Sequence, residues 1–169
     1  MRGIALFVDP TTIMFGKLIL ALFLGGLIGT ERAVIAKQAA GTRAFGLVAM
    51  GSCLLILTSS FVDSQYLGIV NFDPMRLAAG IVTGIGFLGG GLIILRGDAL
   101  HGVTTAAGLW IVTAIGIAVA YSLYSLAIFA TVLTLLTFTG MWYIENRFKN
   151  WFSNYQSNVS GERRTGGEQ

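Results

Sequence analysis

The sequence predicts an all-α polytopic membrane protein with about five transmembrane helices. Its 169 residues are 54% hydrophobic and only 11% charged, whereas an average soluble domain is about 25% charged. The apolar residues gather into runs of roughly the 20 residues that a helix needs to cross a bilayer. We expect a transmembrane domain over residues 1–152 and a disordered cytoplasmic tail over residues 153–169.

The first expected span covers residues 12–29, after a start in which Thr11 or Thr12 can cap the helix. Lys17 ahead of an apolar run also resembles a signal peptide. Against cleavage, Glu31 and Arg32 follow the run directly and it lacks a clean A-x-A site. We therefore interpret this segment as a retained span. The second expected span covers residues 43–62 and contains the single cysteine, Cys53, so no intrachain disulfide can form.

The third expected span, residues 74–95, begins at Asp73-Pro74, a typical pairing of an N-cap residue with proline at the first helical position. A short polar turn with Arg96, Asp98 and His101 follows it. The fourth and fifth spans are expected over residues 104–120 and 123–144. The apolar run from 103 to 144 is about twice one membrane crossing, so it must contain two helices.

The positive charges predict an orientation, because cytoplasmic loops of membrane proteins are enriched in Lys and Arg. In the five-span arrangement, eight such residues lie on one side: Arg32, Lys37, Arg43, Arg96, Arg147, Lys149, Arg163 and Arg164. Three lie on the other: Arg2, Lys17 and Arg76. We therefore expect the N-terminus outside and the C-terminus in the cytoplasm.

The third span matches G-x-G-x-x-G at Gly84, Gly86 and Gly89, but the dinucleotide site needs a strand and a soluble crossover unit around this motif. Helix packing is the better interpretation, because small residues let helices approach closely in lipid. The expected packing glycines are Gly25 and Gly29 in the first span, and Gly80, Gly84, Gly86, Gly90 and Gly91 on two faces of the third. Two such faces predict a central third span. A homo-oligomer contact competes for the same surfaces.

Several charges oppose the helix dipole and therefore predict ion pairs. Arg76 lies in the first turn of the third span, and Asp73 is its nearest acidic partner. Glu31 ends the first span and Arg43 begins the second, so we expect these two to pair; two solvated interface charges are the alternative.

The remaining polar residues give little sign of a cofactor or an active site. Thr104 and Thr105 can cap the fourth span or hydrogen-bond a neighbouring helix. His101 beside Asp98 offers too few ligands for a metal site, and we expect neither a metal nor a cofactor. No nucleophile and base pair is evident, so we expect no enzyme.

None of the expected spans contains Asp or Glu, although intramembrane carboxylates commonly mark ion pathways. Mg²⁺ prefers carboxylate oxygens around a hydrated ion. This counts against a cation transporter, although a pore lined by carbonyl groups or formed between protomers escapes the argument.

Four blocks in order resemble the MgtC/SapB family of bacterial inner-membrane proteins: LILALFLGGLIGTER, AAGTRAFGLVAMGS, DPMRLAAGIVTGIGFLGGGLIILR and HGVTTAAGLWIVTAIGIAVA. The resemblance covers roughly residues 16–121. It implies a link to growth in low Mg²⁺ and, in pathogens, to virulence through survival inside macrophages. The best-known member restrains the ATP synthase rather than carrying Mg²⁺.

The family's recurring polar positions would fall here on Glu31, Arg32, Arg43, Asp73, Arg76, Arg96, Thr104 and Thr105. The chain departs from the family in His101, where Arg is common, and in Gly80, where Gln is frequent. Longer members also carry a cytoplasmic C-terminal domain.

We therefore expect a regulator or adaptor that acts on a membrane complex, with the ATP synthase as one candidate, and that forms a homo-oligomer. The alternative is a transporter or channel for Mg²⁺ or another small solute, formed between protomers. A third hypothesis is a binder of a lipid headgroup or anionic ligand between the charged helix ends.

Overall fold

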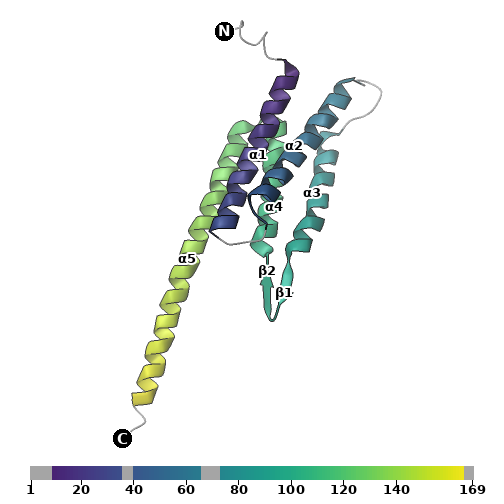
Figure 1. The fold of residues 1–169 in the computed structure, drawn as a ribbon. Helices are drawn as coiled ribbons and strands as arrows, with labels where there is room; N and C mark the ends of the chain where they lie inside the picture. The colour runs from purple at the N-terminus through teal and green to yellow at the C-terminus, as the bar shows by residue number, and fades with distance from the viewer. Residues whose placement is uncertain (1–8, 36–39, 66–72, 166–169) are drawn as a thin grey trace. The chain divides into compact units, whose positions relative to one another are not determined.

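The computed structural model describes residues 9–35, 40–65 and 73–165. The elements in order are α1 (Pro10–Val34), α2 (Thr42–Gln65), α3 (Pro74–Leu92), β1 (Ile94–Arg96), β2 (Ala99–His101), α4 (Val103–Ala120) and α5 (Tyr124–Thr165) (Figure 1). Five helices in the described part are long and apolar enough to cross a membrane. The predicted helical, five-span class is therefore confirmed, and the sidedness of the termini stays a prediction.

The chain divides into two compact units, Met1–Leu135 and Leu136–Gln169. The second unit is the continuation of α5, which remains helical as far as Thr165. The sequence predicts disorder from residue 153, but the helix runs on through most of that segment. Residues 124–165 contain no proline, so nothing in the backbone forces the helix to stop. Residues 166–169 of the expected tail lie outside the described part, and the domain boundary at 152 stays a prediction.

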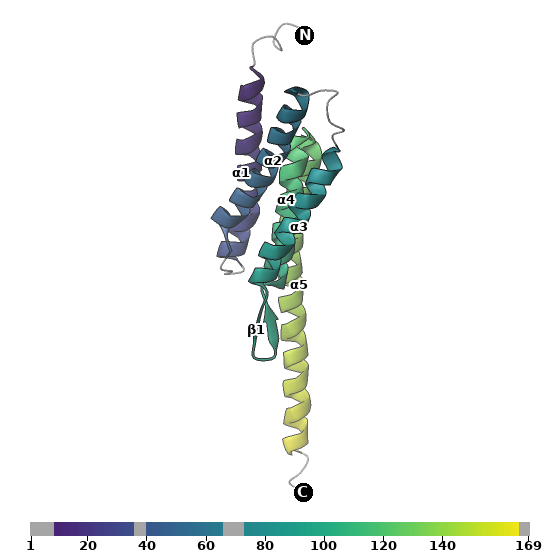
Figure 2. The ribbon, with the colours of Figure 1, turned by 90° about the vertical axis from the view of Figure 1, so that its right-hand side faces the viewer.

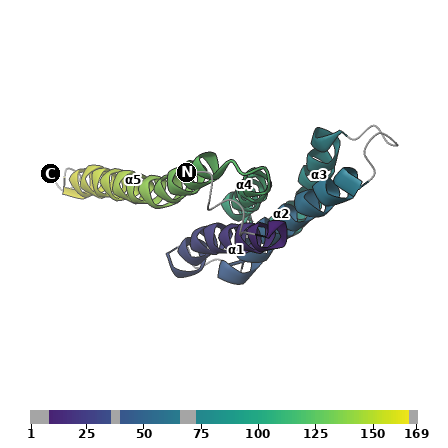
Figure 3. The same cartoon turned by 90° about the horizontal axis from the view of Figure 1, so that it is seen from above.

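Within the first unit, α4 is the central helix and α3 lies at the edge (Figures 2 and 3). The α4 helix contacts α1, α2 and α3. Its buried side chains form a core with those of α1 and α2, including Ile28, Phe45, Ile56, Val112 and Ile115. Among the described residues of α3, only Ile85 is a buried hydrophobic side chain. The expectation of a central third span is therefore wrong.

Glycines of α1 and α4 show how closely the core helices approach. A Cβ atom built on Gly25 would lie 2.7 Å from the Ala49 Cβ, and one on Gly29 would lie 2.8 Å from the Phe45 Cβ. A Cβ atom on Gly116 of α4 would overlap the Ala49 carbonyl oxygen. Real Cβ atoms do not approach other atoms so closely, so α2 fits against both neighbours only because these residues are glycine.

The glycines of α3 behave differently. A Cβ atom on Gly89 would make an ordinary contact of 3.6 Å with the Ala106 Cβ on α4. Apart from the adjacent backbone of α3 itself, no atom lies within 4 Å of the Cβ positions of the five expected packing glycines of this helix, which are Gly80, Gly84, Gly86, Gly90 and Gly91. These five glycines therefore make no close helix contact within the described chain. The spacing of these glycines predicts that another helix can pack closely against α3, but it does not predict which helix does so.

The predicted polar turn between the third and fourth spans is a β-hairpin. Helix α3 ends at Leu92, three residues before the expected end, and β1 pairs with β2 in antiparallel register. Gly97, with φ of 59°, is the first residue of the two-residue turn. A hairpin turn with glycine at this position requires a positive φ there. Farther along, Ser122 has φ of 63° and separates α4 from α5, so the break falls between the expected fourth and fifth spans.

Candidate functional site

A buried polar cluster lies where the C-terminal end of α1 meets the N-terminal end of α4. Glu31 is only 8% exposed and Arg32 only 5%. They follow Ala21, Leu24 and Ile28 along the buried face of α1, so the helical period turns them into the bundle. This happens because α1 continues to Val34, five residues past the expected end of the span.

Arg32 links the two helices directly. Its Nη2 donates a hydrogen bond of 2.9 Å to the Thr104 Oγ1 on α4. Its Nη1 lies 3.8 Å from the Glu31 Oε2. Arg32 also suits its place, because a cation is favoured at the C-terminal end of a helix, whereas Glu31 is disfavoured there. The guanidinium therefore offsets the cost of burying the Glu31 carboxylate.

Two oxygen atoms of this cluster are left with unused hydrogen-bonding capacity. Among the described residues, the buried Glu31 Oε2 and Thr105 Oγ1 have no hydrogen-bond partner. Glu31 also lies near the end of the candidate span Pro10–Val34, so this helix carries an acidic residue that the expected span, residues 12–29, leaves out. A buried carboxylate at the end of a span is a group that an ion or proton pathway could use.

A second polar link joins the opposite ends of the same two helices. The Lys17 Nζ of α1 donates a hydrogen bond of 2.8 Å to the carbonyl oxygen of Ala120, the last residue of α4. Lys17 contacts the end of α4 and Arg32 contacts its beginning, so α1 and α4 run antiparallel and are joined at both ends. This role of Lys17 is not predicted from the sequence, although a lysine within an apolar span requires a buried partner.

Asp73 and Tyr121 lie toward the Lys17 end. The Asp73 carboxylate accepts a hydrogen bond of 3.0 Å from the Met75 backbone N–H and so caps α3, as the sequence predicts. Burial, and secondly the Asp73 charge, raise the pKa of the Tyr121 phenol. This effect of the Asp73 charge reflects the nearness of the beginning of α3 to the end of α4.

The structure separates the remaining charged candidates from the cluster. Arg43 is exposed at the start of α2, and the ion pair found among the described residues joins Glu31 to Arg32 instead. The expected Glu31–Arg43 pair is therefore wrong, because Glu31 turns into the bundle while Arg43 remains at its surface. Arg76 is also exposed, and no ion pair with Asp73 is found in the described part. Arg96 is exposed on the hairpin.

The two threonines have different environments. Gly102 is the N-cap of α4 and no side chain caps this helix, so neither Thr104 nor Thr105 acts as a cap. Thr104 instead accepts the hydrogen bond from Arg32. This confirms the alternative expectation for Thr104, a hydrogen bond to a neighbouring helix. Thr105 is buried on the core side of α4.

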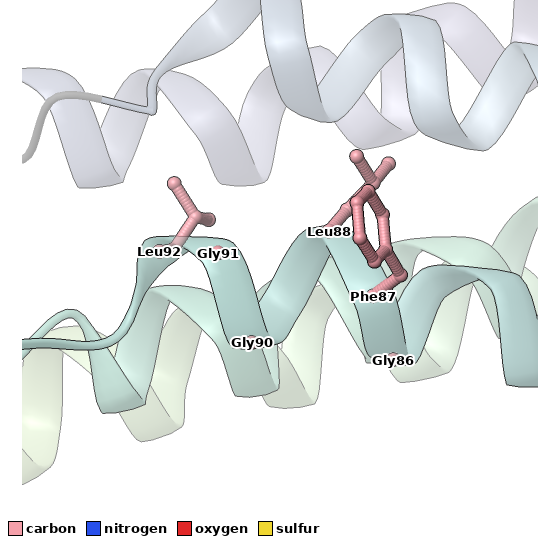
Figure 4. A pocket seen from close by; sticks show the side chains of 6 residues that line it. All are labelled: Gly86, Phe87, Leu88, Gly90, Gly91 and Leu92. Atoms are coloured by element: carbon pink, nitrogen blue, oxygen red, sulfur yellow. The ribbon is translucent and has the colours of Figure 1, made fainter.

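An apolar hollow of about 570 Å³ lies along the C-terminal half of α3. Its lining comes from one stretch of this helix: Gly86, Phe87, Leu88, Gly90, Gly91 and Leu92. Figure 4 shows the side chains of Phe87, Leu88 and Leu92 projecting to one side, while the glycines leave the backbone bare. Three of the expected packing glycines thus line this hollow.

Comparison with known proteins gives a consistent family assignment. The model of the MgtC family matches residues 18–147. "Putative magnesium transporter YhiD" of Escherichia coli strain K12 is 43% identical over 122 residues, which cover 71% of this chain and 56% of YhiD. Protein MgtC of Brucella abortus is 43% identical over 112 residues, which cover 66% of this chain and 44% of that protein.

Protein SrpB of Synechococcus elongatus is 37% identical over 134 residues, covering 73% of this chain and 72% of SrpB. The chain spans about half the length of YhiD and of the Brucella protein. No solved structure matches the chain.

Replacing Arg32 by Met should destabilise the protein by about 3–5 kcal/mol, because Glu31 would then remain buried without its compensating charge. The double variant Glu31→Gln/Arg32→Met should recover most of that loss. The measurement is the free energy of unfolding in mixed micelles of increasing denaturing detergent. Arg43→Met is the matched control and should change the free energy by no more than about 0.5 kcal/mol. A large loss of stability in Arg43→Met that Glu31→Gln relieves would show instead that Glu31 pairs with Arg43.

Proposed function

The chain belongs to the MgtC family of membrane proteins, and on that premise we propose that it is a regulator or adaptor that binds another membrane complex. Its five apolar helices make it a multi-pass membrane protein, and we place it in the bacterial inner membrane. The name of YhiD refers to magnesium transport. Together with the resemblance described above, this supports a role in adaptation to low magnesium.

The exposed glycines on two faces of α3 are the observation that carries this proposal. Gly25, Gly29 and Gly116 are used for close contacts within the core, whereas five glycines of α3 meet no atom within 4 Å. Glycine costs helix stability, and lipid chains gain nothing from a bare backbone. A transmembrane helix of another protein does gain, because close approach increases van der Waals packing.

The hollow along α3 supports the same proposal. Phe87 is 84% exposed beside it, so an aromatic ring and a bare backbone are available to one incoming helix. The ATP synthase is the complex to test first, since the family resemblance points to it. A homo-oligomer would use the same face, and it stays a prediction. This role requires no catalytic residues.

Transport of Mg²⁺ or another small cation between protomers is the second candidate function. The observation that favours it is the buried Glu31 carboxylate, whose Oε2 lacks a hydrogen-bond partner among the described residues. The neighbouring Arg32, only 3.8 Å away, opposes the entry of a divalent cation, so we rank this function second.

The regulatory proposal predicts that the protein slows ATP-driven proton pumping by inverted membrane vesicles. Gly84→Leu should weaken the effect about tenfold, the equivalent of about 1.4 kcal/mol of lost helix contact. Gly51→Leu is the matched control, because Gly51 on α2 also meets no atom within 4 Å. Equal inhibition by both variants would remove α3 from the binding surface. If a photo-crosslinker at position 84 captured only a second copy of this chain, α3 would be the contact surface of a homo-oligomer and not the binding surface for another complex.

The transport candidate predicts Mg²⁺ flux into proteoliposomes that exceeds the flux into empty vesicles and falls at least tenfold in Glu31→Gln. This variant keeps the side-chain shape and removes the charge. Asp98→Asn, on the exposed hairpin, serves as the control and should retain the flux. Absence of flux in a monodisperse wild-type preparation would exclude this candidate and leave regulation.

A further inference from the structure

The β1–β2 hairpin separates its side chains into two faces, one wholly apolar and the other mixed. Directly paired residues of two strands point to the same side of a sheet, and neighbours along a strand point to opposite sides. The pair Leu95 and Leu100 therefore forms one face. Arg96 pairs with Ala99, and Ile94 with His101, on the other. Leu95 and Leu100 are 66% and 65% exposed, so the described part of the chain leaves the apolar face open.

Two glycines fix the position of this hairpin. Gly97 opens the two-residue turn with positive φ, and Gly102 has φ of 89° where the chain enters α4. A Cβ atom on Gly102 would overlap the Leu92 carbonyl oxygen at the end of α3. The base of the hairpin is thus held against α3, and its register is set. A slip of one residue would move the two leucines to the opposite face.

The lengths of the flanking helices place the hairpin at the membrane surface. Helices α3 and α4 contain 19 and 18 residues, which at about 1.5 Å per residue gives roughly 27–29 Å. The hydrocarbon core of a bilayer is about 30 Å thick. Each of the two helices is therefore about as long as the hydrocarbon core is thick. Leu95, three residues after Leu92, lies within about 10 Å of the boundary of this hydrocarbon core.

We propose that the β1–β2 hairpin is an interfacial anchor that inserts Leu95 and Leu100 at the acyl boundary and binds anionic phospholipid headgroups. Arg96 supplies a planar guanidinium that matches phosphate oxygens, and His101 lies on the same face. Asp98 occupies the turn at the tip, farthest from the bilayer, where its carboxylate least opposes the headgroups. Burial in the interface also explains how a lone two-stranded hairpin, marginal in water, keeps its structure.

Spin labels on single cysteines test the apolar face in the full-length protein. Leu95→Cys, Leu100→Cys and Ala99→Cys are made in a Cys53→Ala background, with Leu54→Cys as a lipid-exposed reference on α2. Labels at 95 and 100 should be accessible to oxygen and protected from a water-soluble nickel reagent, as at 54. The label at 99 should show the reverse. Nickel access at 95 and 100 equal to that at 99 would overturn the anchor. Protection from both reagents would also overturn it, in favour of a protein contact.

The headgroup contact is tested by comparing vesicles of phosphatidylcholine alone with vesicles that also contain phosphatidylglycerol. The label at 100 should lie deeper in the anionic vesicles, and Arg96→Gln should abolish the difference. Inorganic phosphate added to phosphatidylcholine vesicles should not reproduce the shift, since the proposal requires phosphate held in a lipid surface. Equal depths in both vesicle types would overturn the contact between Arg96 and anionic lipid.

Discussion

The hydrogen bond from Arg32 to Thr104 is the interaction on which the arrangement of the helices depends. The Arg32 guanidinium is buried and bulk water cannot hydrate it, so its partners must be fixed in the bundle. Thr104 and Glu31 provide them at one end of α1, and the Ala120 carbonyl oxygen provides a partner for Lys17 at the other. These contacts fix α1 and α4 as antiparallel neighbours. They also explain why a carboxylate is tolerated at the end of α1.

The core that results leaves α3 exposed. Once Gly25, Gly29 and Gly116 have brought α1, α2 and α4 into close contact, α3 packs on the core through Gly89 and Ala106 and contributes few buried side chains. Its other glycines then face outward. The exposed glycine faces of α3 and the hairpin fixed at its end suit a protein that binds a neighbouring helix and is anchored in its membrane. Both features follow from the edge position of this helix.

The sequence predicts the helical class and the number of spans because apolar length alone decides them, and it predicts the start of α3 because Asp73-Pro74 is a local cap. It does not predict that α1 continues through Glu31 and Arg32. Consecutive charges usually indicate a loop, and only a distant residue, Thr104, makes their burial tolerable. The hairpin is equally difficult to predict from the sequence, since Ile94 and Leu95 extend an apolar run that could as well be helical. The contacts of each glycine depend on tertiary packing and cannot be read from spacing.

The stability of Gly116→Ala compared with Gly84→Ala tests the central claim most directly, namely that α4 is the packed centre and that α3 presents open glycine faces. The free energy of unfolding in micelles should fall by about 1–3 kcal/mol for Gly116→Ala, because the added methyl group overpacks the contact with α2. It should not fall for Gly84→Ala, where alanine raises helix propensity by up to about 1 kcal/mol and meets nothing. Equal losses, or a larger loss at Gly84, would contradict this arrangement of the helices.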